Sequence, residues 1–480
     1  MDKLLRLYNS TGRWGNIIIL VLLIVFGLIN RLFVVVKHRY ADYIIEAVLI
    51  LIAAFIVYKI YKKNIFEITR NKIFKTLLLV GIVLRIVFAI HDINNRPVQD
   101  SDYEKHERLG KRLAFEGKYY DFTGVELRNF RQPGLPAMFA VGLLILNHPV
   151  TFAIIMILFS FGVLLSGFYL FRDLGNIAAL ISFAYIAISP NMLFMASNSN
   201  TQLSFFFFLI LLFIMLKNYS GKPYQLILIG VILAAEMYIR FNFFLIFLLI
   251  PFIIEKHKDK NLVFAFSKLG YIYLTCLILY SPWIYRNYMI YGKLRLMPTT
   301  GPGIYSSNVT TDYTRAGGYN GVPDSLLTKY GKLSEVDFDR ALNNDAMTFV
   351  KEHPDIYIKG IPFRLLKYAS RQDWTINYFF EFTKYPNAGI IESFFQSIEN
   401  FFFWIIIFYP LIFLYRNKNL GPFSTYILWA YLIYSMVLIP ISESRSRYNF
   451  PYILFPVFAV ALSQRKKYTD PVVSNNEKLI

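Results

Sequence analysis

This chain is poor in cysteine, histidine and acidic residues, and each scarcity excludes a class of site. Cys276 is the only cysteine among 480 residues, so neither a disulfide nor a thiolate metal site can form within one chain. The six histidines are scattered, and none belongs to an HExxH or similar zinc-ligand pattern. No P-loop, GxGxxG or GxSxG motif stands in a supporting context. The sequence therefore implies no resident cofactor and leaves only a divalent metal ion open.

Charge is also scarce: 17% of the residues are charged, whereas 56% are hydrophobic. Together with many apolar runs of membrane-spanning length, this composition predicts a polytopic membrane protein. Lysine and arginine number 50 against 31 acids, which gives a net charge of +19. These basic residues cluster between apolar segments, as in the cytoplasmic loops of membrane proteins. We therefore predict membrane lipids, and no nucleic acid, as partners.

The apolar segments predict an all-α bundle of 12 or 13 transmembrane segments. They lie near residues 15–36, 42–60, 75–91, 134–147, 150–171, 176–189, 202–216, 224–239, 241–255, 262–285, 398–416, 421–441 and 447–464. Segment 134–147 lies among three prolines and has the length of a half-helix that does not cross.

Basic clusters set the expected orientation. Those at 59–75, 217–222, 255–260, 416–418 and 465–467 predict cytoplasmic loops and a cytoplasmic tail. The polar loop at 92–133 and the long segment 287–397 then face outward. All these placements agree only if one short segment does not cross the membrane, and 134–147 is the best candidate. We thus expect a multi-pass cell-membrane protein whose active site faces the extracytoplasmic side.

The same pattern divides the chain into successive parts. We expect two additional N-terminal spans in 1–74, a transmembrane core in 75–286, an extracytoplasmic helical subdomain in 287–397, the last spans in 398–464, and the cytoplasmic tail in 465–480. In the subdomain, Ser334 is a candidate N-cap for a helix.

The first outer loop has the most informative pattern, DSDYEKHERLGKRLAFEGKYYDFTGVELRNFRQPGLP at 100–136. Tyr103, Leu109 and Leu113 fall near helical spacing among charged residues, which predicts an amphipathic helix at the membrane surface. Gly117 should end it. Asp100 and Asp102 stand at its start, where one could serve only as a helix cap, but two exceed what a cap requires.

These residue types suit sugar transfer from a lipid phosphate. Such transfer needs a carboxylate beside the acceptor hydroxyl and cations around the leaving phosphate, both at the membrane interface. Asp100 and Asp102 are the candidate catalytic residues. Arg131, Arg445 and Arg447 are candidates for the donor phosphate, because arginine pairs with phosphate oxygens in a fork. The alternative for any one arginine is an interfacial side chain that reaches the lipid headgroups.

One further charged pair stands near the outer end of a span. Glu236 and Arg240 are four residues apart, so they could simply form an ion pair on one helix face. Ionisable residues within membrane segments are functional candidates by default, which makes Arg240 a weak candidate for substrate binding.

Several stretches together resemble the GT-C superfamily of polyprenyl-phosphate-sugar-dependent glycosyltransferases. The branch they resemble contains the protein O-mannosyltransferases and the lipid A aminoarabinose transferases (glycosyltransferase family 39-like). The first loop carries the likeness through Asp100, Tyr103, Leu113, Gly117, Tyr119 and the stretch 131–136. SPWIYRNYMIYGKLRLMPTTGPGIY at 281–305 and ESRSRYNFPY at 443–452 resemble two later elements of the family.

The resemblance implies an inverting transfer in which the first-loop aspartate acts as a base or orients the acceptor. It also implies a polyprenyl-phosphate sugar as the donor, with a glycan, lipid or protein as the acceptor. Tyr103, Gln202 and Arg286 become weak candidates for substrate binding. The chain departs from the family at Gln132, where a proline is usual, and in Ser197–Gln202, where many members have an acid.

Two other functions stay open. A lipid-linked oligosaccharide flippase or other transporter favours near-symmetric halves and charges at the midplane. A polysaccharide polymerase or ligase relies more on loop arginines than on a first-loop aspartate. The sequence has no internal symmetry, and its paired acids lie in a loop, so the glycosyltransferase is the preferred hypothesis.

The predicted orientation can be tested with one reporter cysteine. In a Cys276→Ser background, Tyr330→Cys should react with a membrane-impermeant maleimide in intact cells, because 287–397 is expected outside. Labelling that requires permeabilisation would contradict the orientation and the outward-facing active site.

Overall fold

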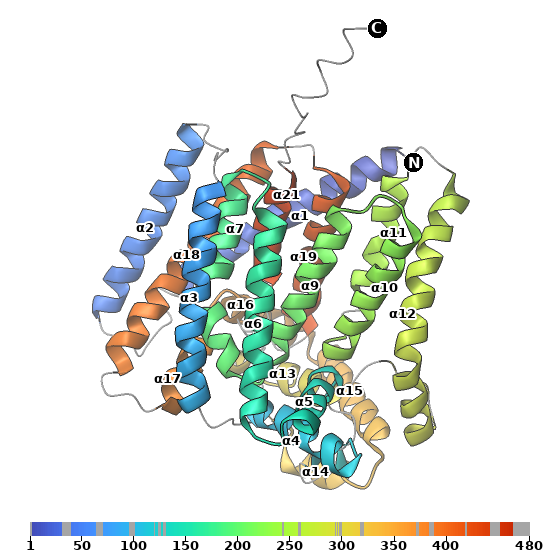
Figure 1. Ribbon diagram of the computed structural model, residues 1–480. Helices are drawn as coiled ribbons and strands as arrows, with labels where there is room; N and C mark the ends of the chain where they lie inside the picture. The colour runs from blue at the N-terminus through green and yellow to red at the C-terminus, as the bar shows by residue number, and fades with distance from the viewer. Residues whose placement is uncertain are drawn as a thin grey trace.

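The computed structural model of the chain is a bundle of long apolar helices, with shorter helices gathered at one end (Figure 1). It describes residues 2–30, 40–63, 71–95, 101–119, 121–122, 126–127, 131–241, 244–257, 261–292, 294, 296, 300–316, 321–370, 374–383, 388–417, 420–441 and 452–463. The first half contains α1 (Asp2–Ile29), α2 (Tyr40–Lys62), α3 (Asn71–Asn95), α4 (Ser101–Glu116), β1 (Asp121–Phe122), β2 (Glu126–Leu127), α5 (Gly134–Ile145), α6 (Val150–Phe171), α7 (Ile177–Ile188), α8 (Pro190–Phe194), η2 (Met195–Ser197), α9 (Thr201–Lys217) and α10 (Pro223–Ile239). The second half contains α11 (Phe244–Lys256), α12 (Leu262–Tyr291), α13 (Gly301–Asn308), η3 (Tyr313–Arg315), α14 (Asp324–Tyr330), α15 (Glu335–Glu352), α16 (Pro354–Tyr368), α17 (Trp374–Thr383), α18 (Ala388–Arg416), α19 (Pro422–Ile441), η4 (Tyr452–Leu454) and α21 (Phe455–Ser463).

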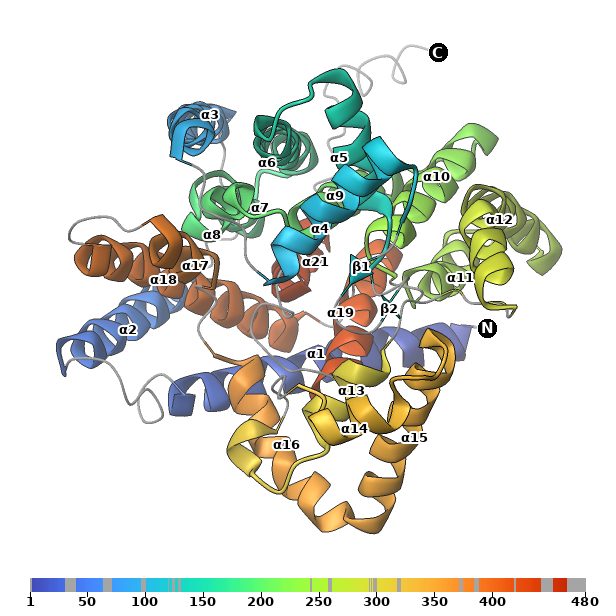
Figure 2. The same ribbon diagram turned by 90° about the horizontal axis from the view of Figure 1, so that it is seen from below.

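The predicted all-α membrane fold is confirmed. Within the described residues, six helices are long and apolar enough to cross a membrane, and the bent pair α7–α8 is a seventh candidate. Helices α2, α3 and α12 lie at the rim of the bundle and expose large aliphatic side chains, such as Leu51 (69%), Ile90 (61%) and Leu274 (60%) (Figure 2). Apolar surface this extensive is rare in water and suits contact with lipid. The count of 12 or 13 spans stays a prediction, because it depends on shorter apolar helices such as α9 and α10.

Helices α4, α5 and α13–α15 lie at one end of the bundle, which we call the loop end (Figures 1 and 2). Segment 134–147, expected not to cross, is the 12-residue α5, which packs beside α4. Helix α4 lies across the loop end and is amphipathic, as predicted, and Gly117 follows its last residue with φ of 64°. Its buried face includes Tyr103 and Leu109, and also His106, which the sequence pattern groups with the polar positions.

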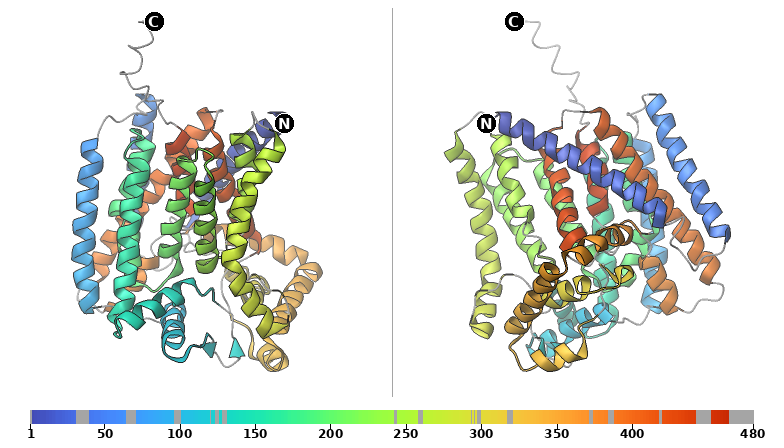
Figure 3. Two further views of the ribbon diagram at one scale, coloured as in Figure 1. Left: turned by 45° about the vertical axis from the view of Figure 1, so that its right-hand side comes forward. Right: turned by 180° about the vertical axis from the view of Figure 1, so that it is seen from behind.

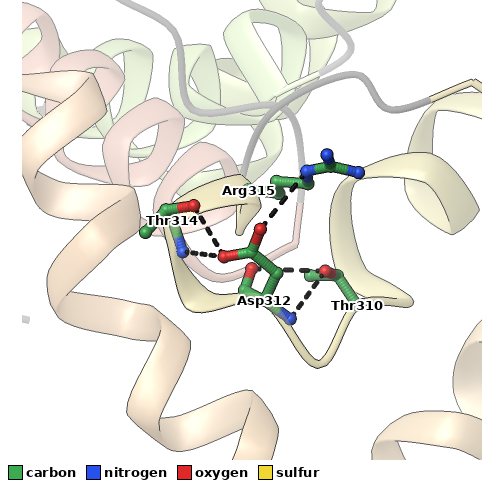
Figure 4. A network of polar contacts seen from close by, with 4 residues as sticks. All are labelled: Thr310, Asp312, Thr314 and Arg315. Atoms are coloured by element: carbon green, nitrogen blue, oxygen red, sulfur yellow. Dashed lines mark hydrogen bonds and ion pairs between the residues drawn. The ribbon is translucent and has the colours of Figure 1, made fainter.

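The described parts of 287–397 are helical, and side-chain caps fix the ends of two of these helices. Ser334 caps α15 as predicted, because its hydroxyl accepts a hydrogen bond from the Asp337 amide at 3.2 Å. Asp312 caps η3, between α13 and α14: it accepts hydrogen bonds from the hydroxyl and the amide of Thr314 and pairs with Arg315 (Figure 4). The hydrogen bonds from Thr314 lower the pKa of the Asp312 carboxyl below its usual value.

Helix α1 crosses the back of the bundle obliquely and packs on α19 (Figure 3). The Asn16 amide donates to the Leu428 carbonyl at 2.8 Å, and the Trp429 indole donates to the Tyr8 carbonyl at 3.0 Å. Gly12 makes this contact possible, because a Cβ there would lie 2.8 Å from the Trp429 indole nitrogen. The described part of α1 is thus fixed to the C-terminal helices through polar contacts to backbone.

The span formed by α7 and α8 bends by 44° at Ser189, and a buried charge stabilises each side of the break. Arg85 of α3 donates to the Ile186 and Ala187 carbonyls at the end of α7, at 2.7 and 2.9 Å. Glu399 of α18 accepts from the Ser189 hydroxyl at 2.6 Å and from the Asn191 amide of α8 at 3.2 Å. Cations favour helix C-termini and anions favour N-termini, so each charge has the sign that its helix end requires.

Removing the Glu399 carboxylate should destabilise the fold. Glu399→Ala leaves buried donors from α7 and α8 unpaired, which should cost about 2–4 kcal/mol. We expect a melting temperature in detergent lower by several degrees. Glu392→Ala, two turns earlier on the same helix and partly exposed, is the matched control. Equal melting temperatures for the two variants would show that Glu399 does not hold the break.

Candidate active site

The stretch Arg131–Pro136, where the first loop ends, packs against the last turn of α10. Gly134 allows this approach, because a Cβ there would lie 2.7 Å from the Tyr238 carbonyl oxygen. A side chain at that position would therefore push the first loop away from α10. Glycine at 134 places the basic end of the loop beside the end of α10.

Tyr119 links the first loop to α12. The Arg286 guanidinium donates to the Tyr119 carbonyl at 3.0 Å, and the Tyr119 hydroxyl donates to the Arg131 carbonyl, also at 3.0 Å. The Arg286 guanidinium also lies 4.6 Å from the centre of the Trp283 ring, a distance typical of cation–π contacts. Two stretches of the family resemblance, in the first loop and at 281–305, are thus in direct contact.

The polar segment Ser197–Gln202 is buried at the loop end. Asn200 is the N-cap of α9, because its side chain accepts from the amides of Gln202 and Leu203 at 3.0 and 3.2 Å. The Ser199 hydroxyl donates to Glu107 of α4 at 2.5 Å. A carboxylate from the first loop therefore reaches the segment that has no acid of its own. The side-chain amide of Asn198 is fully buried, and neither its oxygen nor its nitrogen has a hydrogen-bond partner among the described residues.

Glu236 and Arg240 do not form the ion pair that their spacing allows. Helix α10 ends at Ile239, and Arg240 has extended backbone angles (φ −146°, ψ 121°), so its side chain leaves the helix face. The Arg240 guanidinium lies 5.8 Å from the ring of Phe205 in α9. Both carboxylate oxygens of Glu236 and the Nη1 of Arg240 are buried without a hydrogen-bond partner among the described residues.

These contacts close a ring around the loop end. Gly110 of α4 packs on Phe139 and Pro136 of α5, and Gly134 at the start of α5 packs on the end of α10. Arg240 then reaches Phe205 near the start of α9, and Ser199 just before α9 bonds back to α4. Four segments, namely α4, the 131–136 stretch, the end of α10 and the 197–202 segment, therefore lie around one region.

The structure places the predicted site residues unevenly. The described residues do not include Asp100, Arg445 or Arg447. Asp102 lies in the first turn of α4, but the structure does not describe its side chain. Arg131 and Arg240 are half-buried at the ring, and Gln202 is buried in the first turn of α9. Tyr103 is buried on the face of α4 that packs toward the bundle. Arg286 holds Tyr119 through its guanidinium, which is a contact within the protein.

Sequence reasoning missed Glu107 and Asn198. Glu107 follows Tyr103 by four residues, so the buried face of α4 could have indicated it. Nothing in the sequence marks Asn198, because its burial depends on the packing of α4 over the segment. Among the described residues, no group of three or more histidine, cysteine, aspartate or glutamate side chains could hold a metal ion.

Comparison with known proteins adds little. No protein-family model and no curated protein matches this chain. Three solved chains match it, and one is the crystal structure of ArnT from Cupriavidus metallidurans bound to undecaprenyl phosphate. The two chains are 10% identical, with a TM-score of 0.39, and the match covers 80% of this chain and 77% of ArnT. A likeness at this TM-score carries no argument, so fold and function rest on the residues of this chain.

The Ser199–Glu107 contact should hold α4 against the bundle. Ser199→Ala and Glu107→Gln should each raise hydrogen exchange of the α4 amides roughly 10- to 100-fold, because a hydrogen bond to a charged group contributes about 1.5–3 kcal/mol. Glu104→Gln is the control, because Glu104 pairs only on the exposed side of α4, with Arg108 at 3.2 Å. Exchange at the control level in both variants would rule out this role.

Proposed function

We propose that this protein is a membrane glycosyltransferase of the GT-C type. It moves a sugar from a polyprenyl-phosphate donor to an acceptor hydroxyl at the loop end. The observation that carries the proposal is the ring of polar residues from α4, the 131–136 stretch, the 197–202 segment and the end of α10. It lies where the apolar helices end, the depth at which a lipid-linked phosphate presents its head group.

The proposed reaction is a direct displacement with inversion. The acceptor oxygen bonds to the anomeric carbon from the face opposite the phosphate. The bond between that carbon and the phosphate oxygen breaks, and its electron pair leaves with the polyprenyl phosphate. Asp100 takes the proton of the acceptor hydroxyl, and Asp102 assists it. A carboxylate is required because a neutral hydroxyl is a weak nucleophile until a base takes its proton.

Arginines are proposed to hold the donor phosphate. Arg131 and Arg240 lie at the ring, and Arg445 and Arg447 precede η4 in the chain, although they lie outside the described residues. Their guanidinium groups would offset the charge that develops on the leaving phosphate. Arg286 is less suited to this task, because its two terminal nitrogens already donate to Asn287 and Tyr119, each at 3.0 Å.

The bent span is the one feature that favours a transporter. Broken helices with buried charges line the substrate sites of many transporters. In this chain Arg85 donates to the carbonyls of Gly81, Ser160, Ile186 and Ala187 and to the Ser160 hydroxyl, all at 2.7–3.2 Å. Protein groups therefore occupy the Arg85 guanidinium, which supports a structural role at the break.

The proposed base can be tested by one pair of variants. Asp100→Asn keeps the size and capping ability of the side chain but cannot take a proton, so the rate should fall about 10²- to 10⁴-fold. The assay uses purified protein with radiolabelled polyprenyl-phosphate sugars. Asp173→Asn, an exposed residue beyond the other end of α6, is the control. Full activity in Asp100→Asn with an inactive Asp102→Asn would assign the base to Asp102. Full activity in both aspartate variants would show that the first loop does not supply the catalytic base.

A further inference from the structure

Glu236 stands apart from the other buried carboxylates. Its side chain is 2% exposed, and neither of its oxygens has a hydrogen-bond partner among the described residues. Four other acids buried to a similar degree, Glu46, Glu335, Asp339 and Glu399, each accept at least one hydrogen bond. A buried carboxylate without a partner costs several kcal/mol, so a residue of this kind points to a missing ligand.

The surroundings of Glu236 contain a cation that it does not bind. Arg240 follows one turn later and also has a buried nitrogen without a hydrogen-bond partner among the described residues. Aromatic rings lie on one side of the Arg240 guanidinium: Arg240 lies over Phe205, whose ring centre is 5.7 Å from that of Tyr452 at the start of η4. Glu236 is near enough to Tyr452 and Tyr426 for its charge to act on both. The pair therefore faces the start of the last helix from α10.

A ligand for this pair must carry two kinds of group. It needs O–H or N–H donors for the carboxylate and an anion for the guanidinium, and the two must be adjacent. A sugar joined to a phosphate has both, because ring hydroxyls donate to carboxylates and phosphate oxygens accept from arginine. The unpaired atoms of Glu236 and Arg240 match the two halves of a glycosyl phosphate.

We infer that Glu236 binds hydroxyl groups of the transferred sugar while Arg240 binds the phosphate of the same donor. This inference rests on the proposed function and adds to it the residue that recognises the sugar. Glu236 takes no proton in the reaction; its carboxylate accepts hydrogen bonds that hold the sugar against Phe205 and Tyr452. The pair distinguishes a loaded donor from the bare lipid phosphate left after transfer, because only the loaded donor has a group for Glu236.

The test compares bare and sugar-bearing lipids. The full-length protein in detergent is titrated with undecaprenyl phosphate, and separately with undecaprenyl phosphate that carries glucose, mannose or a pentose. Glu236→Gln should bind the best of the sugar-bearing lipids about ten- to hundredfold more weakly than the wild type, and bare undecaprenyl phosphate equally well. Glu236→Leu, which removes a buried charge and need not unfold the chain, should show the same pattern. Arg240→Gln should weaken binding of all four lipids.

Glu255→Gln, the same substitution in the last turn of α11, is the matched control and should bind all four lipids like the wild type. The inference is overturned if the Glu236 variants bind the sugar-bearing lipids like the wild type, or lose bare undecaprenyl phosphate by the same factor. It is also overturned if no sugar improves binding by the wild type. If the wild type binds none of the lipids, the proposed function itself fails. If Arg240→Gln loses lipid binding while the Glu236 variants bind all four lipids like the wild type, the proposed function stands, but Glu236 does not bind the sugar.

Discussion

The two buried charges at the break between α7 and α8 are the interaction on which the loop end depends. Inside a bilayer, a backbone group released from a helix must find a partner within the protein. Arg85 and Glu399 meet this requirement from opposite sides of Ser189, and each matches the dipole of the helix end that it contacts. The chain can then leave the helix, pass through η2 and place the polar segment 197–202 at the loop end.

The buried polar side chains fall into two groups according to their hydrogen bonds within the protein. Arg85, Glu46 and Glu399 bind protein groups on several sides, so they hold helices together. The side chains of Glu236 and Asn198 are also buried, yet the described residues offer the Glu236 carboxylate and the Asn198 side-chain amide no hydrogen bond. Glu236 stands in the last turn of α10, which packs on Gly134, and Asn198 precedes α9 in the segment that Ser199 joins to α4. Both therefore lie near helix ends that contact the first loop.

The first loop is held at several points. Gly110 and Gly134 let α4 and α5 approach their neighbours closely, Glu107 reaches Ser199, and Tyr119 accepts from Arg286. A catalytic loop needs this restraint, because a base displaced by even about 1 Å from its productive position loses much of its effect on the rate. The contacts of the loop thus suit a catalytic element better than a linker.

The sequence alone determined the class of the protein and the local ends of its helices. Apolar runs predict an all-α membrane bundle, Gly117 ends α4, and Ser334 caps α15, because hydropathy and capping depend on neighbouring residues. The tertiary structure decided which polar residues meet. Glu107 and Ser199 are 92 residues apart, and spacing along the chain cannot predict their contact. Glu236 and Arg240 have the spacing of an ion pair, yet α10 ends before Arg240 and the pair does not form. Which charges find partners depends on packing between distant segments, and that is set only when the bundle is assembled.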